Sequence, residues 1–145
     1  MQALRTLYRY GTVILVAMVL IQIGAAGFGA FDAAEHLPHK TSPPLTEKVF
    51  DDGWSFHTAF GYVVFVAAVV LFLLALTSRM GKRRVLHVLG LPIMVAIQIV
   101  LAWASESTHW VGPFHALLAF GILGASGRLV YEAWRPVRAA DVVGT

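Results

Sequence analysis

The sequence has no cysteine and little charge. Only 13% of its 145 residues are Asp, Glu, Lys or Arg, where soluble domains usually carry about 25%. The lack of cysteine excludes a disulfide framework and any thiolate-ligated metal site. With 58% hydrophobic residues and a mean hydropathy of +0.72, the chain is also no ordinary soluble enzyme or disordered tail, because a single small domain exposes too much surface to hide so much apolar area.

Hydrolytic motifs are missing as well. We find no Ser-His-Asp order, no phosphate-binding loop and no zinc-protease helix motif. We therefore do not expect a stand-alone enzyme of these classes.

Four long runs of the sequence contain no charged residue. Each is close to the roughly 20 apolar residues that a membrane-spanning helix needs. We predict helices at about 11–31, 53–77, 85–105 and 108–131, joined by an outer loop, 32–52, and a cytoplasmic loop, 78–84. The predicted fold class is all-α, a four-helix transmembrane bundle in one membrane domain, 1–145.

The charged residues divide between the two sides of this predicted bundle. The acidic side holds Asp32, Glu35, Glu47, Asp51, Asp52 and Glu106, and the basic side holds Arg5, Arg9, Arg79, Lys82, Arg83, Arg84, Arg128, Arg135 and Arg138. The positive-inside rule places the basic side in the cytoplasm. We expect a multi-pass protein of the bacterial inner (plasma) membrane with both termini in the cytoplasm. The sequence pI of about 9.6 then reflects topology, and we expect no nucleic-acid partner.

The two halves of the chain share a short sequence pattern, which we call the echo. The first and third predicted helices share a mid-span Ile-Gln-Ile, and the second and fourth share a Phe-His pair that is followed by Phe-Gly. This order indicates two tandem two-helix repeats about an axis along the membrane normal. The matched residues are Gln22 and Gln98, His57 and His115, and Gly61 and Gly121.

The two histidines of this echo lie inside predicted spans, where ionisable groups are rare and usually functional. We place them roughly 6 and 10 Å below the outer boundary on parallel helices. Two imidazoles facing one interior suit axial ligation of a haem iron, with Gly61 and Gly121 leaving room for the flat ring. Gln22 and Gln98 are expected to bond across helices, or to contact the cofactor or a quinone. Alternatively, all of these residues pack helices without a cofactor.

Three more histidines, His36, His39 and His109, lie in the outer connections near carboxylates. Such groups can bind Zn²⁺ or Cu²⁺, which makes metal handling a further alternative. Their spacing matches no closed zinc site, so we interpret them as solvated loop side chains.

One stretch resembles a known family. Val111-Gly112-Pro113-Phe114-His115-Ala116-Leu117-Leu118-Ala119 is similar to the His-bearing fourth helix of haem A synthase, and His57 corresponds in position to the histidine of its second helix. The chain thus resembles one four-helix half of that family. It departs from the family pattern in three ways. Thr58 follows His57 in place of Arg, the acids Asp51 and Asp52 lie further back than the family's Glu, and the external cysteine pair is absent.

The resemblance implies a small haem b-binding membrane protein, either a diminished relative of the family or a one-haem electron carrier, and the three departures count against the family's hydroxylating activity. We expect it to bind one haem iron through His57 and His115 near the outer face and to transfer single electrons. Its partners would be the lipid bilayer and either quinone or a larger respiratory or photosynthetic complex. The alternative is a cofactor-free accessory or structural subunit of a larger membrane complex.

Overall fold

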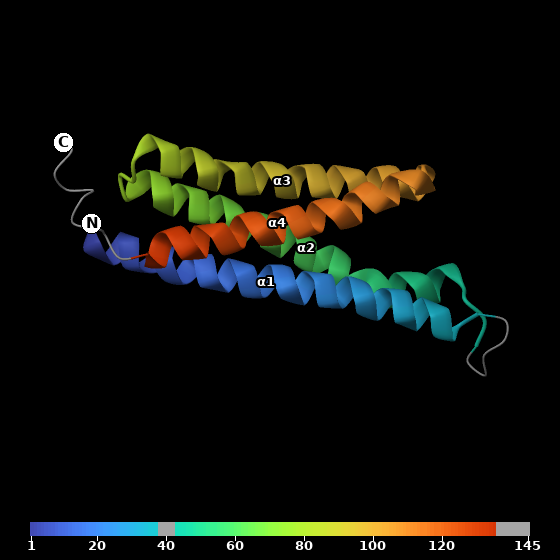
Figure 1. Ribbon diagram of the computed structural model, residues 1–145. Coiled ribbons are helices and arrows are strands. Elements are labelled where there is room, and N and C mark those ends of the chain that lie inside the picture. The colour runs from blue at the N-terminus through green and yellow to red at the C-terminus, as the bar shows by residue number, and fades with distance from the viewer. Residues whose placement is uncertain (38–42, 136–145) are drawn as a thin grey trace.

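Four long helices make up nearly all of the described chain. The computed structural model describes residues 1–37 and 43–135. The helices are α1 (Gln2–Glu35), α2 (Glu47–Thr77), α3 (Lys82–Ser107) and α4 (Gly112–Trp134), with a short 3₁₀ helix, η1 (His109–Val111), before α4. They lie side by side along one axis (Figure 1), and no strand occurs within the described residues. The predicted all-α, four-helix fold is confirmed.

Each helix contacts two neighbours, in the ring order α1, α2, α3, α4 and back to α1. The diagonal pairs, α1 with α3 and α2 with α4, do not touch through their backbones. Small and aliphatic side chains such as Leu15, Ala68, Leu91 and Leu129 fill the interior of the ring. This arrangement sets α2 and α4 opposite each other across the core.

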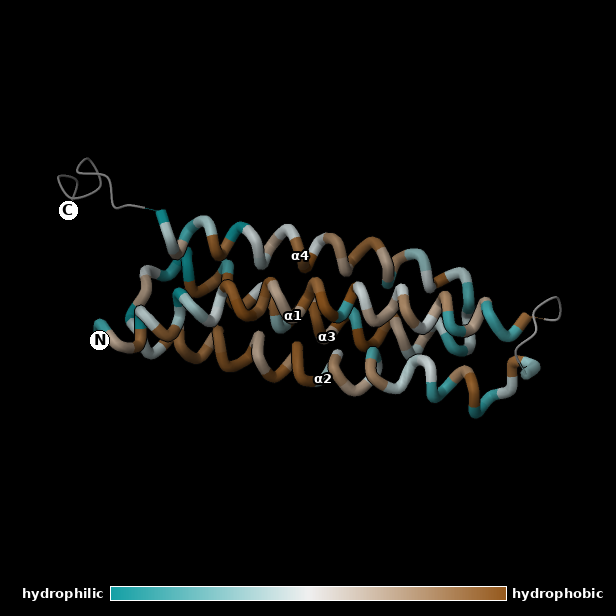
Figure 2. The backbone as a smooth tube through the Cα atoms, turned by 90° about the horizontal axis from the view of Figure 1, so that it is seen from below, coloured by the Kyte–Doolittle hydropathy of each residue, from teal (hydrophilic) through white to brown (hydrophobic). Residues whose placement is uncertain are grey.

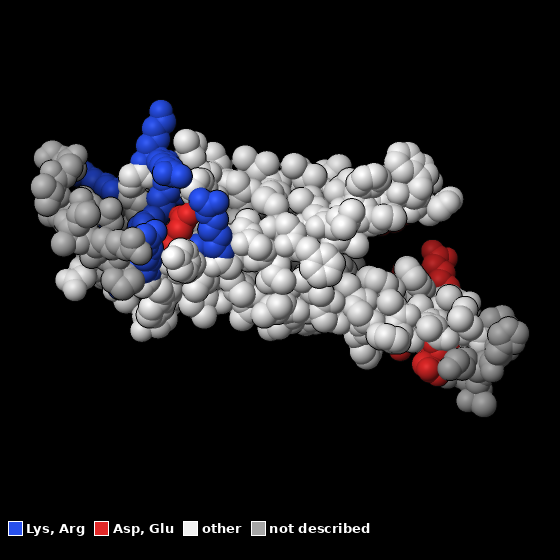
Figure 3. Space-filling model, in the orientation of Figure 1, with Lys and Arg blue, Asp and Glu red and all other residues white. Residues whose placement is uncertain are grey.

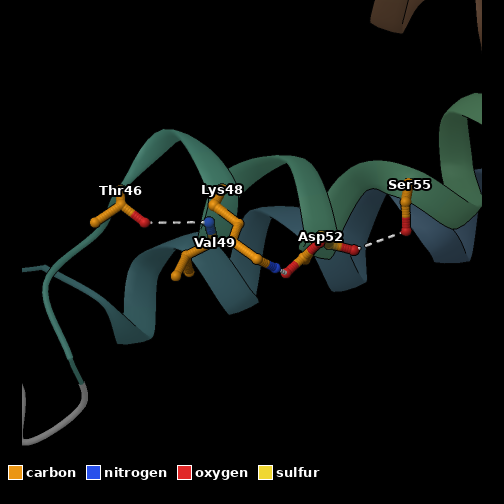
Figure 4. Close-up of polar contacts among 5 residues, drawn as sticks. All are labelled: Thr46, Lys48, Val49, Asp52 and Ser55. Atoms are coloured by element: carbon orange, nitrogen blue, oxygen red, sulfur yellow. Dashed lines mark hydrogen bonds and ion pairs between the residues drawn. The ribbon is translucent and has the colours of Figure 1, made fainter.

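The helices extend beyond the charge-free runs that predicted them. The expected outer loop 32–52 is shorter in the structure, because α1 continues to Glu35 and α2 already begins at Glu47. At this start the hydroxyl of Thr46 accepts a hydrogen bond from the Val49 N–H (3.3 Å), and Lys48 pairs with Asp52 one turn on (Figure 4). Capping and i,i+4 pairing both favour a helix in water. A charge-free run therefore predicts only the apolar part of such a helix and misses its charged ends.

Large apolar side chains cover the outside of the bundle. Phe28 is 66% exposed, Leu117 67% and Phe120 63%, and the tube is hydrophobic along its middle and hydrophilic towards both ends (Figure 2). All four helices are long and apolar enough to cross a membrane. Because a membrane helix presents its apolar side chains to lipid, these features indicate an integral membrane protein in contact with the bilayer.

The charges gather at the two ends of the bundle (Figure 3). We call the end where α1 begins, α2 meets α3 and α4 stops the basic end, and the end where α1 meets α2 the acidic end. At the basic end the Arg9 Nε donates to the Ala133 carbonyl at 2.7 Å, which ties the start of α1 to the end of α4. The predicted separation of basic and acidic residues is therefore present in three dimensions.

Candidate functional site

Gln22 on α1 and His57 on α2 each bond to the main chain of the other, an arrangement that we call the clasp. The Gln22 Nε2 donates to the His57 main-chain carbonyl at 2.8 Å, and the His57 Nδ1 lies 3.1 Å from the Gln22 main-chain carbonyl. The Gln22 Nε2 is 3.5 Å from the His57 Nε2, which is longer than an ordinary hydrogen bond. Gln22 therefore bonds across helices, and this clasp fixes the rotation of the imidazole ring.

Gln98 on α3 and His115 on α4 make the same clasp. The Gln98 Nε2 donates to the His115 carbonyl at 2.8 Å, and the His115 Nδ1 lies 3.0 Å from the Gln98 carbonyl. Because a carbonyl oxygen can only accept, Nδ1 of each ring carries a proton. In a neutral imidazole the lone pair then remains on Nε2. Metal-ligating imidazoles usually donate their other ring N–H to a carbonyl or carboxylate oxygen in this way.

The two imidazoles meet across the bundle, from the diagonal helices α2 and α4. Their ring centroids are 6.2 Å apart, with 64° between the ring planes. A metal–imidazole bond is about 2.0–2.1 Å long, so two imidazoles on opposite sides of one ion hold their centroids roughly 6 Å apart. The observed centroid separation is close to this value, and it also lies in the range of an ordinary edge-to-face ring pair.

A cavity of about 150 Å³ adjoins the pair and is lined by residues of all four helices, His57 and His115 among them. The side chains of Tyr62, Trp103 and Glu106 also line it and are exposed. The Oε1 atoms of Gln22 and Gln98 are buried and have no hydrogen-bond partner within the described chain. Two buried amide oxygens without a partner thus accompany the two imidazoles.

The two glycines of the echo have different surroundings. Gly61 lines the cavity, and a Cβ there would lie 3.1 Å from the Gln22 Nε2. Gly61 therefore makes room for the amide of the clasp. Gly121 is exposed, its Cβ position lies 3.3 Å from the Met94 Cε, and it is not among the residues that line the cavity.

Sequence reasoning missed the aromatic support of the site. The Trp54 indole packs edge-on against the His57 ring, with centroids 5.4 Å apart. Trp54 precedes His57 by three residues, the spacing of neighbours on one helix face. That spacing could have predicted the Trp54–His57 contact from the sequence. The positions of Trp103 and Glu106 at the cavity could not be predicted, because they depend on how α3 packs.

The other histidines lie away from this pair. The His36 Nδ1 is 2.6 Å from the Pro43 carbonyl, His109 is exposed in η1, and His39 lies outside the described residues. His87 contacts Glu132 near the basic end (3.5 Å). Within residues 1–37 and 43–135, no group of three or more His, Cys, Asp or Glu could hold a metal ion.

Comparison with family models, with curated proteins and with solved structures finds no match to this chain. Any function of this chain must therefore be inferred from the geometry of the imidazole pair and its cavity.

Proposed function

We propose that this protein is a small membrane cytochrome. It holds one b-type haem between His57 and His115 and transfers single electrons to and from a quinone or a larger membrane complex. The observation that carries this proposal is the 6.2 Å separation of the two imidazole rings, each held by a main-chain carbonyl at Nδ1. Both Nε2 atoms would be available to hold the haem iron, the role that histidine plays in haem proteins.

The donor set favours haem over a bare metal ion. Structural and catalytic zinc sites use three or four protein ligands, and the described chain offers no group of three. A haem would supply the other ligands of its own iron, so two imidazoles would be enough to hold it. Because the sequence has no cysteine, covalent attachment through a Cys-x-x-Cys-His motif is excluded, and the haem would be of the non-covalent b type.

The size of the cavity sets a condition on this proposal. Cofactor pockets usually measure roughly 300–1,000 Å³, and the cavity beside the histidines measures about 150 Å³. Haem binding therefore requires rim side chains to turn outward. Tyr62 and Trp103 are 45% and 57% exposed, so they face lipid rather than packed protein.

The absorption spectrum of the full chain tests this proposal. We expect protein purified in mild detergent, from cells supplied with haem precursor, to show a Soret band and, after reduction, the sharp visible bands of a six-coordinate b-type haem. Haem extraction by acid acetone checks that the group is not covalently bound. A folded but colourless protein that also fails to bind added haemin would contradict the proposal.

One observation favours a second candidate function, a cofactor-free accessory subunit. Both imidazoles already have a hydrogen-bond partner, and each clasp by itself joins two neighbouring helices. Interhelical polar bonds of this kind stabilise membrane proteins without any ligand. A colourless protein that co-purifies in fixed stoichiometry with a larger complex would support this candidate.

We further propose an inner-membrane orientation with both termini in the cytoplasm, which follows from the basic end and the positive-inside rule. Because the chain has no cysteine, a single introduced cysteine is its only thiol. A membrane-impermeant maleimide added to intact bacterial spheroplasts should label Ser107→Cys at the acidic end. It should label Lys82→Cys at the basic end only after permeabilisation. Labelling in the reverse pattern would contradict this orientation.

A further inference from the structure

A second cavity lies at the basic end, and it shares no lining residue with the cavity beside the histidine pair. It has a volume of about 450 Å³ and is formed by the start of α1, the connection from α2 to α3 and the end of α4. Arginines dominate its lining: Arg5, Arg9, Arg79, Arg84 and Arg135.

The positive charge of this cavity is not neutralised by the described residues around it. Glu132 is the one acid among the lining residues of the described chain, and its carboxylate is engaged by Arg128 (2.9 Å) and His87 (3.5 Å). Arg84 donates to the main-chain carbonyl of Glu132 at 3.4 Å. No carboxylate within residues 1–37 and 43–135 pairs with any of the five lining arginines.

A buried hydroxyl provides a second, independent observation. Tyr8 lines the cavity, its side chain is 0% exposed, and its hydroxyl has no hydrogen-bond partner in the described chain. A buried polar atom without a partner is unfavourable and rare in folded proteins. An anion in the cavity would give this hydroxyl an acceptor.

The α2–α3 connection places an arginine of unusual backbone conformation at the cavity. Arg79 adopts φ 50°, and the flanking N–H groups of Arg79 and Met80 donate to Leu76 and Ala75, which is the pattern of a Schellman helix end. Glycine is the usual residue at this left-handed position because it has no Cβ. The sequence nevertheless has an arginine here, and that arginine lines the cavity.

We infer that this cavity binds a phosphate-bearing anion. Guanidinium groups match phosphate oxygens in a fixed, two-pronged geometry, and several of them around one concave site favour a group of more than one charge. The volume suits a phosphorylated head group better than a small bare ion. Basic pockets between membrane helices commonly hold anionic lipid head groups, and a soluble phosphate compound offers the same chemistry. This inference is independent of haem binding.

Ligand-induced stabilisation of the full chain in neutral detergent tests this inference and separates the two sources. The probes are inorganic pyrophosphate and, separately, short-chain phosphatidylglycerol, with short-chain phosphatidylcholine as the uncharged comparison. We expect one of the two anions to raise the unfolding temperature saturably. A response to pyrophosphate indicates a soluble ligand, and a response to phosphatidylglycerol alone indicates a lipid.

Two substitutions test whether the ligand binds in this cavity, and neither is expected to destabilise the fold. Tyr8→Phe removes only the unpartnered hydroxyl, so the ligand-free protein should stay as stable or become more stable, while affinity falls about tenfold. Arg79→Gly suits the left-handed backbone and should weaken binding roughly threefold to tenfold. The matched controls are Lys82→Gln and Arg83→Gln, which remove a charge from the same end without lining the cavity.

The controls should change affinity by less than about twofold. The inference is overturned if neither anion stabilises the protein. It is equally overturned if the controls weaken binding as much as Tyr8→Phe and Arg79→Gly, because diffuse surface charge then explains the effect.

Discussion

Replacing either His57 or His115 with alanine is expected to abolish the absorption of a six-coordinate haem. Each imidazole is one half of a pair whose rings lie 6.2 Å apart, and no third His, Cys, Asp or Glu of the described chain completes a metal site with them. Loss of one axial ligand leaves the iron five-coordinate and weakly held. We expect at least a tenfold loss of haem per protein, the lower range for loss of interactions that support a metal, measured as the Soret-to-280 nm ratio.

His87→Ala and His109→Ala are the matched controls, because both remove a histidine outside the pair. They should retain the haem content of the original protein. Thermal unfolding of the haem-free proteins checks the fold, and each His→Ala change should cost only about 1 kcal/mol for its lost interhelical bond. If the spectrum of His57→Ala or His115→Ala is unchanged, that histidine is not a ligand.

The second large effect is expected at Gly29, where α1 packs directly against Trp54 and Gly53 of α2. A Cβ at this position would lie 2.8 Å from the Trp54 Cδ2 and 3.2 Å from the Gly53 main-chain oxygen. Neither an indole ring nor a backbone carbonyl moves easily, so Gly29→Ala should force the two helices apart. We expect a loss of about 1–3 kcal/mol in the free energy of unfolding, measured by denaturation in mild detergent.

Gly24→Ala on the same helix is the matched control, because nothing lies within 4 Å of its Cβ position. Alanine is the better helix former by about 1 kcal/mol, so this change should leave stability unchanged or raise it. Since Trp54 packs against His57, Gly29→Ala should also reduce haem content, and Gly24→Ala should not. Equal stability of the two variants would show that the close approach at Gly29 is unimportant.

The fold could be predicted from the sequence because lipid imposes a strong pattern. A chain that must satisfy all backbone hydrogen bonds in an apolar core has to form helices of about 20 residues, and charge-free runs of that length reveal them. The helix ends were harder to predict. Charged residues such as Glu35 and Glu47 belong to helices that continue into water, and their ends depend on local contacts such as the Thr46 cap.

The candidate site could be predicted in part. The echo of Gln22–His57 by Gln98–His115 indicated matched polar residues, and the structure brings all four to one level of the bundle. The sequence could not show that each glutamine amide bonds to the histidine main chain, because that contact depends on helix rotation. The cavity at the basic end was missed for a similar reason. Its arginines come from three separate segments, and in sequence they report only membrane orientation.

The proposed function requires two imidazoles to hold one iron inside this bundle. Electron paramagnetic resonance of the oxidised, haem-loaded protein tests it most directly, because the signal reports the axial ligands of ferric iron. We predict a low-spin ferric signal typical of two imidazole ligands, replaced by a high-spin signal in both His57→Ala and His115→Ala. A high-spin signal in the unmodified protein, or a low-spin signal that survives either substitution, would show that His57 and His115 do not both hold the iron.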